Sequence, residues 1–314
     1  MNVVDDAAAL LGERVRRDVP LGPMTTYRVG GPAALFVRID TDADLAAVCR
    51  AVRRTGIQTL VVGKGSNLLV ADRGFAGLAV TLGDHFAGVE IRGTTVRAGA
   101  AAALPVVARR SAAAGLTGFE WAVGVPGSIG GAVRMNAGGH GSDMAAALVG
   151  VRLVDLRSGE DEVVSAETLD LGFRRSAVAA HQLVVWAELQ LAPGDRNRAE
   201  ATIAEIVRWR REHQPGGANA GSVFVNPPGD AAGRLVELAG MKGHRLRSAV
   251  VSPKHANFII ADEGGRADDV FDLMLAVQDR VRRHCGVTLY PETRLVGFDP
   301  SPLDRPEPRS EVER

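Results

Sequence analysis

The sequence has few of the residues that build disulfide frameworks and metal centres. Its two cysteines, Cys49 and Cys285, form neither a disulfide framework nor a CxxC motif. The seven histidines are dispersed, with no HExxH motif and no pair at helical spacing. We therefore expect no metal site.

Charge of one sign and long hydrophobic runs are absent as well. Lys and Arg total 37 and Asp and Glu total 37, so no positive excess is available for a nucleic-acid partner. The longest run of small apolar residues, 98–108, is interrupted by Gly99 and Pro105 and is shorter than the ~20 residues that span a bilayer. The first twenty residues contain Asp5 and Asp6 and lack the basic segment of a signal peptide. These features predict a cytoplasmic protein without membrane insertion.

Glycine, in contrast, is abundant. It accounts for 37 of 314 residues, about 12% against a usual ~7%, whereas aromatic residues make up only 4%. Because the chain is not of low complexity, this composition favours close approach of the backbone to a ligand. It is a first indication of phosphate binding.

The N-terminal part alternates short strands, glycine-rich segments and helices. Apolar runs predict buried strands at 60–62 and 68–70, and alternation predicts hairpins over 89–98 and 151–164. Helical spacing over 44–54 places Leu45, Val48, Cys49 and Val52 on one buried stripe. Cys49 is therefore expected to serve packing rather than chemistry.

After Pro193-Gly194-Asp195 the pattern changes. We expect helices over 200–212, near 233–239 and over 268–284, and strands near 249–251 and 257–261. The residues from 298 onward are mostly Pro, Asp, Glu, Arg and Ser, which is typical of disorder. A length of 314 residues, against ~150 per domain, suggests two domains. We predict domains at 1–195 and 196–297 and a disordered tail at 298–314.

Two glycine-rich segments could cradle phosphate groups with their backbone N–H groups. The first, Gly63-Lys64-Gly65-Ser66-Asn67, has Gly65 where a Walker A loop needs Ser or Thr, and Leu68 where a Rossmann fingerprint needs its third glycine. The second, 124–131, has the spacing GxxGxxGG. Either alone is as consistent with a structural turn. Two such loops, both expected between strands, favour a dinucleotide-type ligand in a third architecture.

Five motifs in order resemble one family. They are TTYRVGGPA at 25–33, VGKGSNLLV at 62–70, GVPGSIGGAVRMNAG at 124–138, AGSVF at 220–224 and PETR at 291–294. The chain thereby resembles the UDP-N-acetylenolpyruvoylglucosamine reductase (MurB) family over roughly residues 20–297. The resemblance implies an α+β fold, with a p-cresol-methylhydroxylase-type FAD-binding domain followed by a smaller α+β substrate-binding domain.

The resemblance also implies a reaction. NADPH, through non-covalently bound FAD, would reduce the enolpyruvyl group of a nucleotide sugar to D-lactyl and give UDP-N-acetylmuramate for peptidoglycan. The protein is expected to act as a monomer on this small-molecule substrate. The cofactor-binding residues carried over are Tyr27, Gly63, Lys64, Gly65, Ser66, Asn67, Leu68, Gly124, Pro126, Gly127, Ser128, Gly130, Gly131, Asn136, Ala137 and Gly138.

Arg174 matches the family's catalytic arginine in Phe173-Arg174-Arg175-Ser176. Addition of hydride to the double bond pushes negative charge into the substrate carboxylate, so a fixed cation should face it. The planar fork of arginine suits two-point contact with a carboxylate. Spacing alone would favour a surface arginine at this position.

Ser222 and Glu292 match the other two catalytic residues. The Ser222 hydroxyl is the expected proton donor, since a strongly basic carbon can take its proton when the geometry is fixed. Glu292 is expected to help stabilise the enediolate, and a raised pKa is expected for it beside a carboxylate. Without their motifs, these residues would be interpreted as a turn serine and a surface glutamate.

Asn226, Lys254 and His255 are candidates for holding the substrate diphosphate or sugar hydroxyls, although His255 equally suits a core position. The chain departs from the family at Val225, where a basic residue is frequent, and Lys254 is a candidate for replacing its charge. The two tyrosines, Tyr27 and Tyr290, both lie outside 174–222, so the lid tyrosine of longer relatives is absent and the shorter type is indicated.

Two rival functions remain open from the sequence. A flavin oxidase of the same FAD fold would consume oxygen with a small alcohol, and AGSVF together with PETR argues against it. A non-catalytic nucleotide-sugar sensor is disfavoured by the matching positions Arg174, Ser222 and Glu292, whereas Val225 keeps it open.

Overall fold

Residues 2–298 and 303 of the chain are described by a computed structural model. The tail predicted for 298–314 lies outside the described residues, except for Phe298 and Leu303. These two side chains pack against the C-terminal core, and Phe298 stacks on Phe271 with ring centroids 4.3 Å apart. None of the helices in the described part has the length and apolarity that crossing a membrane requires.

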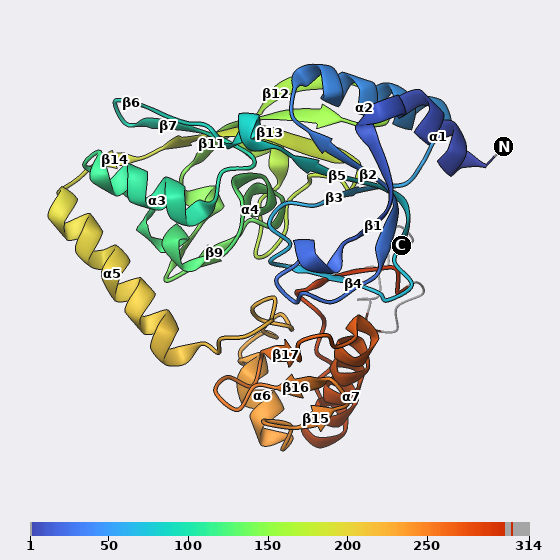
Figure 1. The fold of residues 1–314 in the computed structure, drawn as a ribbon. Coiled ribbons are helices and arrows are strands. Elements are labelled where there is room, and N and C mark those ends of the chain that lie inside the picture. The colour runs from blue at the N-terminus through green and yellow to red at the C-terminus, as the bar shows by residue number, and fades with distance from the viewer. Residues whose placement is uncertain (1, 299–302, 304–314) are drawn as a thin grey trace, which may run out of the picture.

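The first sheet has the strand order β1-β2-β5-β3, formed by Val15–Pro20, Pro32–Ile39, Phe75–Leu82 and Thr59–Val61. β1 is antiparallel to β2, and the other pairs are parallel. Helices α1 (Val3–Leu11) and α2 (Asp42–Thr55) cover it (Figure 1). α2 begins at a capping box formed by Thr41 and Asp44. The strand predicted at 60–62 and the helix predicted over 44–54 are confirmed as β3 and α2, and Cys49 is buried as expected.

The second sheet is antiparallel, with the order β12-β11-β13-β7-β6. Its strands are Asp161–Ser165, Leu148–Asp155, Gln182–Gln190, Thr95–Gly99 and Val89–Arg92, so both predicted hairpins are confirmed. Helices α3 (Leu104–Ala113), α4 (Ile129–Met135) and α5 (Arg196–His213) pack on this sheet through one core. Figure 1 shows α5 as the outermost of the three.

The second glycine segment differs from its prediction as a loop between strands. A 3₁₀ helix, Glu120–Gly124, precedes it, and residues Ile129–Met135 form α4. Burial explains the helix, because Ile129, Ala132 and Val133 recur at helical spacing and enter the core. Two glycines in the first turn concealed this pattern.

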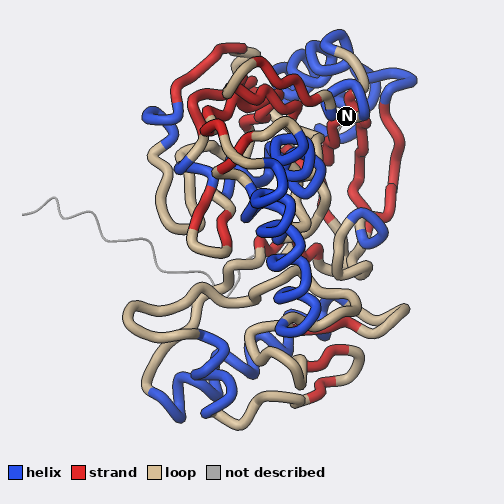
Figure 2. The backbone as a smooth tube through the Cα atoms, turned by 90° about the vertical axis from the view of Figure 1, so that its left-hand side faces the viewer, coloured by secondary structure: helices blue, strands red, loops and turns tan. Residues whose placement is uncertain are grey.

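The C-terminal part is a three-stranded antiparallel sheet packed with two helices. Its elements are β15 (Arg245–Leu246), β16 (Ala249–Val251), β17 (Ile259–Ala261), α6 (Ala232–Leu238) and α7 (Ala267–Cys285). The helices predicted here and the two strands are present, and α7 ends at Gly286 in the left-handed conformation. Figure 2 shows this smaller part below the two N-terminal sheets, with α5 descending beside the N-terminal part toward it.

The N-terminal and C-terminal parts are joined by strand pairing and by a shared core as well as by the chain that links them. β18 (Arg294–Val296) returns to pair in parallel with β4 (Leu68–Val70), directly after the first glycine loop. Tyr27, Val29 and Leu69 belong to the C-terminal core, whereas Ala199 and Ile203 of α5 belong to the N-terminal one. We therefore propose that the N-terminal unit extends through α5, beyond the boundary predicted at residue 195.

Short elements complete the fold. They are the strands β8 (Leu116–Thr117), β9 (Gly138–Gly139), β10 (Ser142–Asp143) and β14 (Ala192–Pro193), and the 3₁₀ helices Gly12–Arg14, Gly22–Met24, Asp84–Ala87, Met144–Ala146 and Ala166–Leu169.

Candidate active site

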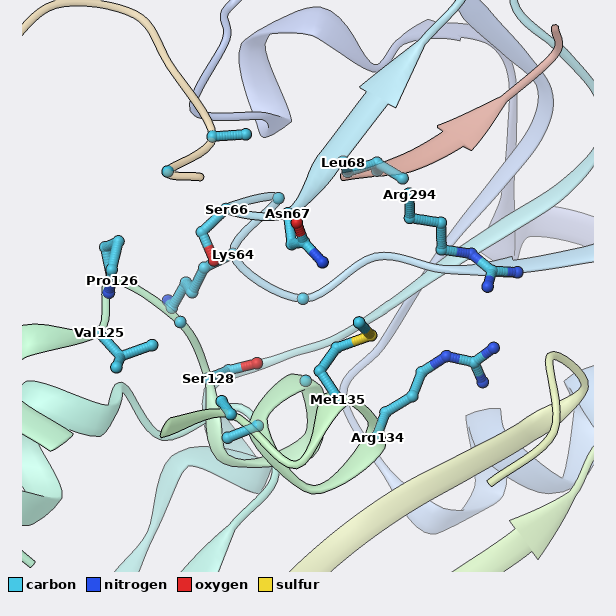
Figure 3. Close-up of a pocket in the computed structure, with 18 of the residues that line it drawn as sticks. Lys64, Ser66, Asn67, Leu68, Val125, Pro126, Ser128, Arg134, Met135 and Arg294 are labelled. Atoms are coloured by element: carbon cyan, nitrogen blue, oxygen red, sulfur yellow. The ribbon is translucent and has the colours of Figure 1, made fainter. Parts of the chain in front are cut away.

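A cavity of about 290 Å³ lies where the two glycine segments meet the C-terminal part (Figure 3). Its walls come from the first glycine loop, from 124–128 and α4, and from the segments at 219–222 and 292–294. Most of the predicted cofactor residues line it, namely Gly63, Lys64, Gly65, Ser66, Asn67, Leu68, Gly124, Pro126, Gly127, Ser128, Gly131, Ala137 and Gly138.

The three predicted catalytic residues line this same cavity. Arg174 Nε lies 2.8 Å from Glu292 Oε1, and their side chains are 25% and 19% exposed. The contact is an ion pair rather than an aligned hydrogen bond, since the Nε–H has no acceptor among the described residues. The folded chain thus brings a guanidinium, a hydroxyl and a carboxyl to one space.

Arg174 stands on a tight turn with a left-handed backbone, φ +57°. Gly172 and Arg175 close the turn by exchanging backbone hydrogen bonds of 3.0 and 3.1 Å. The Asn136 side-chain amide donates to the Gly172 carbonyl at 3.0 Å. Ser176 Oγ donates to the carbonyl of Arg134 at 2.7 Å. The end of α4 therefore anchors the turn on both sides of Arg174.

Ser222 follows Gly221, whose φ of +76° favours glycine. Asn219 accepts the Gly221 N–H at 3.0 Å, and the buried Asn257 exchanges side-chain hydrogen bonds with the backbone of Phe224. The carbonyl of Val223, next to Ser222, accepts the Glu292 N–H at 2.8 Å. The serine segment and the glutamate segment are thus fixed to each other through the backbone.

Burial raises the pKa of Glu292, and the nearby Arg174 guanidinium opposes this shift. The raised pKa agrees with the sequence-based expectation. A carboxyl that holds its proton more readily can lie against a second carboxylate with less repulsion.

The glycine segments leave room for a dinucleotide. A Cβ on Gly63 would lie 2.7 Å from Ser128 Oγ, at the point where the two segments meet. A second cavity of about 120 Å³ adjoins the first and shares Gly63, Lys64, Ser128, Gly131 and Arg134 with it. Two adjoining cavities, with glycine backbone and cations among the residues that they share, fit FAD, whose two halves are joined by a diphosphate. FAD would be held by the predicted cofactor residues that line the first cavity and by the residues that line the second.

Three predicted cofactor residues lie elsewhere. Gly130 lines the second cavity. Asn136 is 2% exposed and lines neither cavity, because its side chain binds Asp143, Ala145 and Gly172. Tyr27 is fully buried in the C-terminal core, its hydroxyl has no hydrogen-bond partner in the described chain, and burial raises its pKa.

The three predicted substrate residues also lie outside the large cavity. Asn226 Oδ1 accepts the Ala232 N–H at 3.0 Å, near the start of α6. Lys254 Nζ donates to the Arg211 carbonyl at 2.6 Å, so it does not replace the charge missing at Val225 within this cavity. His255 accepts from Asn257, packs edge-on against Phe258, and has a pKa lowered by burial.

Sequence reasoning missed several lining residues that carry polar or apolar groups into the cavity. They are Arg134, Met135, Arg210, Gln214, Asn219, Phe258 and Arg294. Arg134 and Arg294 were inside two of the quoted motifs, and the charge of Arg134 among apolar and small residues was a usable signal. The others fall outside the quoted motifs, apart from Met135.

Two family models match the chain. An FAD binding domain matches residues 33–165, and the C-terminal domain of UDP-N-acetylenolpyruvoylglucosamine reductase matches residues 213–296. The chain is also similar to whole proteins of that name. It is 42% identical over 290 residues to the one from Heliobacterium modesticaldum, covering 91% of each chain, and 39% identical over 282 residues to the one from Rubrobacter xylanophilus, covering 89% and 94%.

A solved structure gives the same answer for the fold. The UDP-N-acetylenolpyruvylglucosamine reductase from Thermus caldophilus superposes with a TM-score of 0.79 at 35% sequence identity. The match covers 90% of this chain and 99% of that one. The expected α+β architecture with an FAD-binding domain is thereby confirmed.

Proposed function

The chain belongs to the UDP-N-acetylenolpyruvoylglucosamine reductase family, and from this premise we propose how it catalyses its reaction. The enzyme reduces the enolpyruvyl group of UDP-N-acetylglucosamine enolpyruvate to D-lactyl, and the product UDP-N-acetylmuramate is a peptidoglycan precursor for the cell wall. Bound FAD would supply the redox chemistry, taking a hydride from NADPH and delivering it to the substrate double bond.

Arg174 orients the substrate carboxylate. Hydride addition to the terminal carbon leaves negative charge on the neighbouring carbon and on the carboxylate oxygens, as an enediolate. The guanidinium stabilises that charge where it develops. Glu292, close to Arg174 and with a raised pKa, adds a hydrogen-bond donor when protonated.

Ser222 completes the reduction by giving its hydroxyl proton to the charged carbon. The new C–H bond takes the electron pair of the enediolate, and the serine oxygen regains a proton from water. The observation that carries this proposal is the convergence of Arg174, Ser222 and Glu292 on one cavity lined by the glycine segments.

The cellular setting belongs to the same proposal. NADPH and nucleotide sugars are cytoplasmic metabolites, so we assign the reaction to the cytoplasm, with NADPH as reductant and no nucleic-acid partner. All three proposed catalytic residues come from one chain, which supports action as a monomer.

The purified full chain tests the proposal. It is expected to be yellow with an oxidised flavin spectrum and to oxidise NADPH only when the enolpyruvyl nucleotide sugar is present, releasing UDP-N-acetylmuramate. A colourless protein that FAD does not reconstitute would overturn it. Oxygen consumption with a small alcohol in place of this reaction would instead identify a flavin oxidase.

A further inference from the structure

The cavity is much more positive than the chain as a whole. Among the described residues, five basic side chains line it, those of Lys64, Arg134, Arg174, Arg210 and Arg294, and one acid, Glu292, whereas the whole sequence is neutral. Glu292 is already paired with Arg174. Four cations in the cavity wall are therefore left for anionic ligands to balance.

Arg134 and Arg294 are the pair that most needs an anion. Figure 3 shows their guanidinium groups one above the other at the same end of the cavity. Loss of hydration and the charge of Arg294 lower the pKa of Arg134 to about 10, and loss of hydration lowers the pKa of Arg294. The Arg294 side chain is exposed and lines the cavity. The protein around it therefore reduces its hydration but leaves it accessible to a ligand.

The donors of this pair are largely unused. Arg134 Nη1 donates to the Ala179 carbonyl, which fixes the orientation of its guanidinium. Within residues 2–298 and 303, neither arginine forms an ion pair, and the Arg294 side chain makes no hydrogen bond. Two neighbouring guanidinium groups with free N–H donors are suited to an oxyanion that carries more than one charge.

The position of Arg134 indicates which oxyanion. Arg134 lines both cavities, together with Gly63, Lys64, Ser128 and Gly131 at their junction. A ligand with two large ends and a diphosphate between them would place the diphosphate at such a junction. We propose that Arg134 and Arg294 together form a diphosphate-binding site beside the junction of the two cavities.

This inference rests on the proposed function, which brings two diphosphates to the enzyme, one in FAD and one in the nucleotide sugar. The test uses Arg134→Gln and Arg294→Gln in the full chain, with Arg175→Gln as the matched control. Arg175 lies beside Arg174 but is exposed and paired with Asp170. Flavin-free protein is titrated with FAD and with riboflavin, which lacks phosphate, and the holoenzyme is titrated with UDP.

We expect both variants to raise the Kd for FAD by about 10-fold to 100-fold, as for the loss of a hydrogen bond to a charged group. Riboflavin affinity and the control variant should be unchanged. The FAD affinity of the variants should also depend less steeply on ionic strength, because a cation has been removed. A rise in the Kd for UDP alone would assign the same site to the nucleotide sugar.

The inference is overturned if neither the FAD nor the UDP Kd rises, or if riboflavin binding weakens as much as FAD binding. If Arg134→Gln fails to fold after losing its contact with Ala179, Arg294→Gln still decides, since no described residue contacts that side chain by a polar bond. A wild-type chain that binds neither FAD nor UDP would instead refute the proposed function itself.

Discussion

Asn67 binds the backbone at Glu292 and again at Arg294, two residues further along the chain. Its side-chain amide donates to the Glu292 carbonyl at 3.1 Å, and its own carbonyl accepts the Arg294 N–H at 3.0 Å. Asn67 is the last residue of the first glycine loop, directly before β4. Hydrogen bonds therefore join the loop that is proposed to bind the cofactor to the segment whose carboxyl is proposed to act on the substrate.

Because Glu292 is largely buried, we predict that replacing it by the neutral glutamine stabilises the folded protein. Its pKa is raised above the ordinary value of 4.5 by burial, with Arg174 opposing. Folding is therefore favoured by the protonated group below the ordinary pKa, and this contribution is lost as the pH rises through the raised pKa. At pH values above the raised pKa, we expect Glu292→Gln to melt at a higher temperature than the wild type, although it loses activity.

Thermal unfolding across a pH series checks this prediction, with exposed Glu263→Gln as control. The difference between Glu292→Gln and the wild type should shrink as the pH falls toward the ordinary glutamate pKa. A wild type that is more stable than the variant at neutral pH would contradict it, and would show that the Arg174 ion pair outweighs desolvation.

The junction of the two glycine segments predicts a steric effect on cofactor binding. In Gly63→Ala, the new methyl group would lie 2.7 Å from Ser128 Oγ and must displace it into the junction. We expect about a 10-fold or greater loss of FAD affinity, equivalent to about 1.4 kcal/mol. Gly88→Ala is the control, because a Cβ there meets no atom within 4 Å. Equal FAD affinity of both variants, measured by flavin fluorescence, would contradict the assignment.

The buried Asn136 predicts a separation between cofactor binding and catalysis. Asn136→Ala removes the hydrogen bonds to Gly172 and Ala145, so we expect a stability loss of about 1–3 kcal/mol. The turn that carries Arg174 loses its anchor, so the rate of substrate reduction should fall while FAD affinity is kept. Thr168→Ala, which removes one exposed side-chain hydrogen bond nearby, is the control.

Kinetics and FAD titration of these two variants decide the role of Asn136. A loss of FAD affinity at an unchanged rate of substrate reduction would support the cofactor contact that the family resemblance implied. It would count against a positioning role for this side chain.

Local periodicity was sufficient for much of the fold. The hairpin over 89–98 and the helix over 268–284 follow from alternation and helical spacing, which are properties of neighbouring residues. α4 was not predicted because Gly130 and Gly131 have low helix propensity, whereas burial in the core stabilises the helix. The same limit applied to α1, which packs its small apolar side chains against α2 and the first sheet.

The site was less accessible to local reasoning. No periodicity relates Arg174 to Glu292, and only the motif resemblance predicted that they meet. Asn226, Lys254 and His255 were chosen for their chemistry, but the fold directs these side chains to backbone partners. Arg134 and Arg294 were passed over although a charged residue within a motif must be solvated or paired.

The central claim, that Ser222 protonates the substrate after hydride transfer, is tested most directly by rapid mixing of Ser222→Ala. The two half-reactions are followed separately through the flavin absorbance, bleaching by NADPH and recovery with the enolpyruvyl nucleotide sugar. We predict unchanged bleaching and recovery slowed by at least about 10²-fold, with partial rescue in Ser222→Cys, which keeps an acidic proton. Recovery at the wild-type rate in Ser222→Ala would contradict the account.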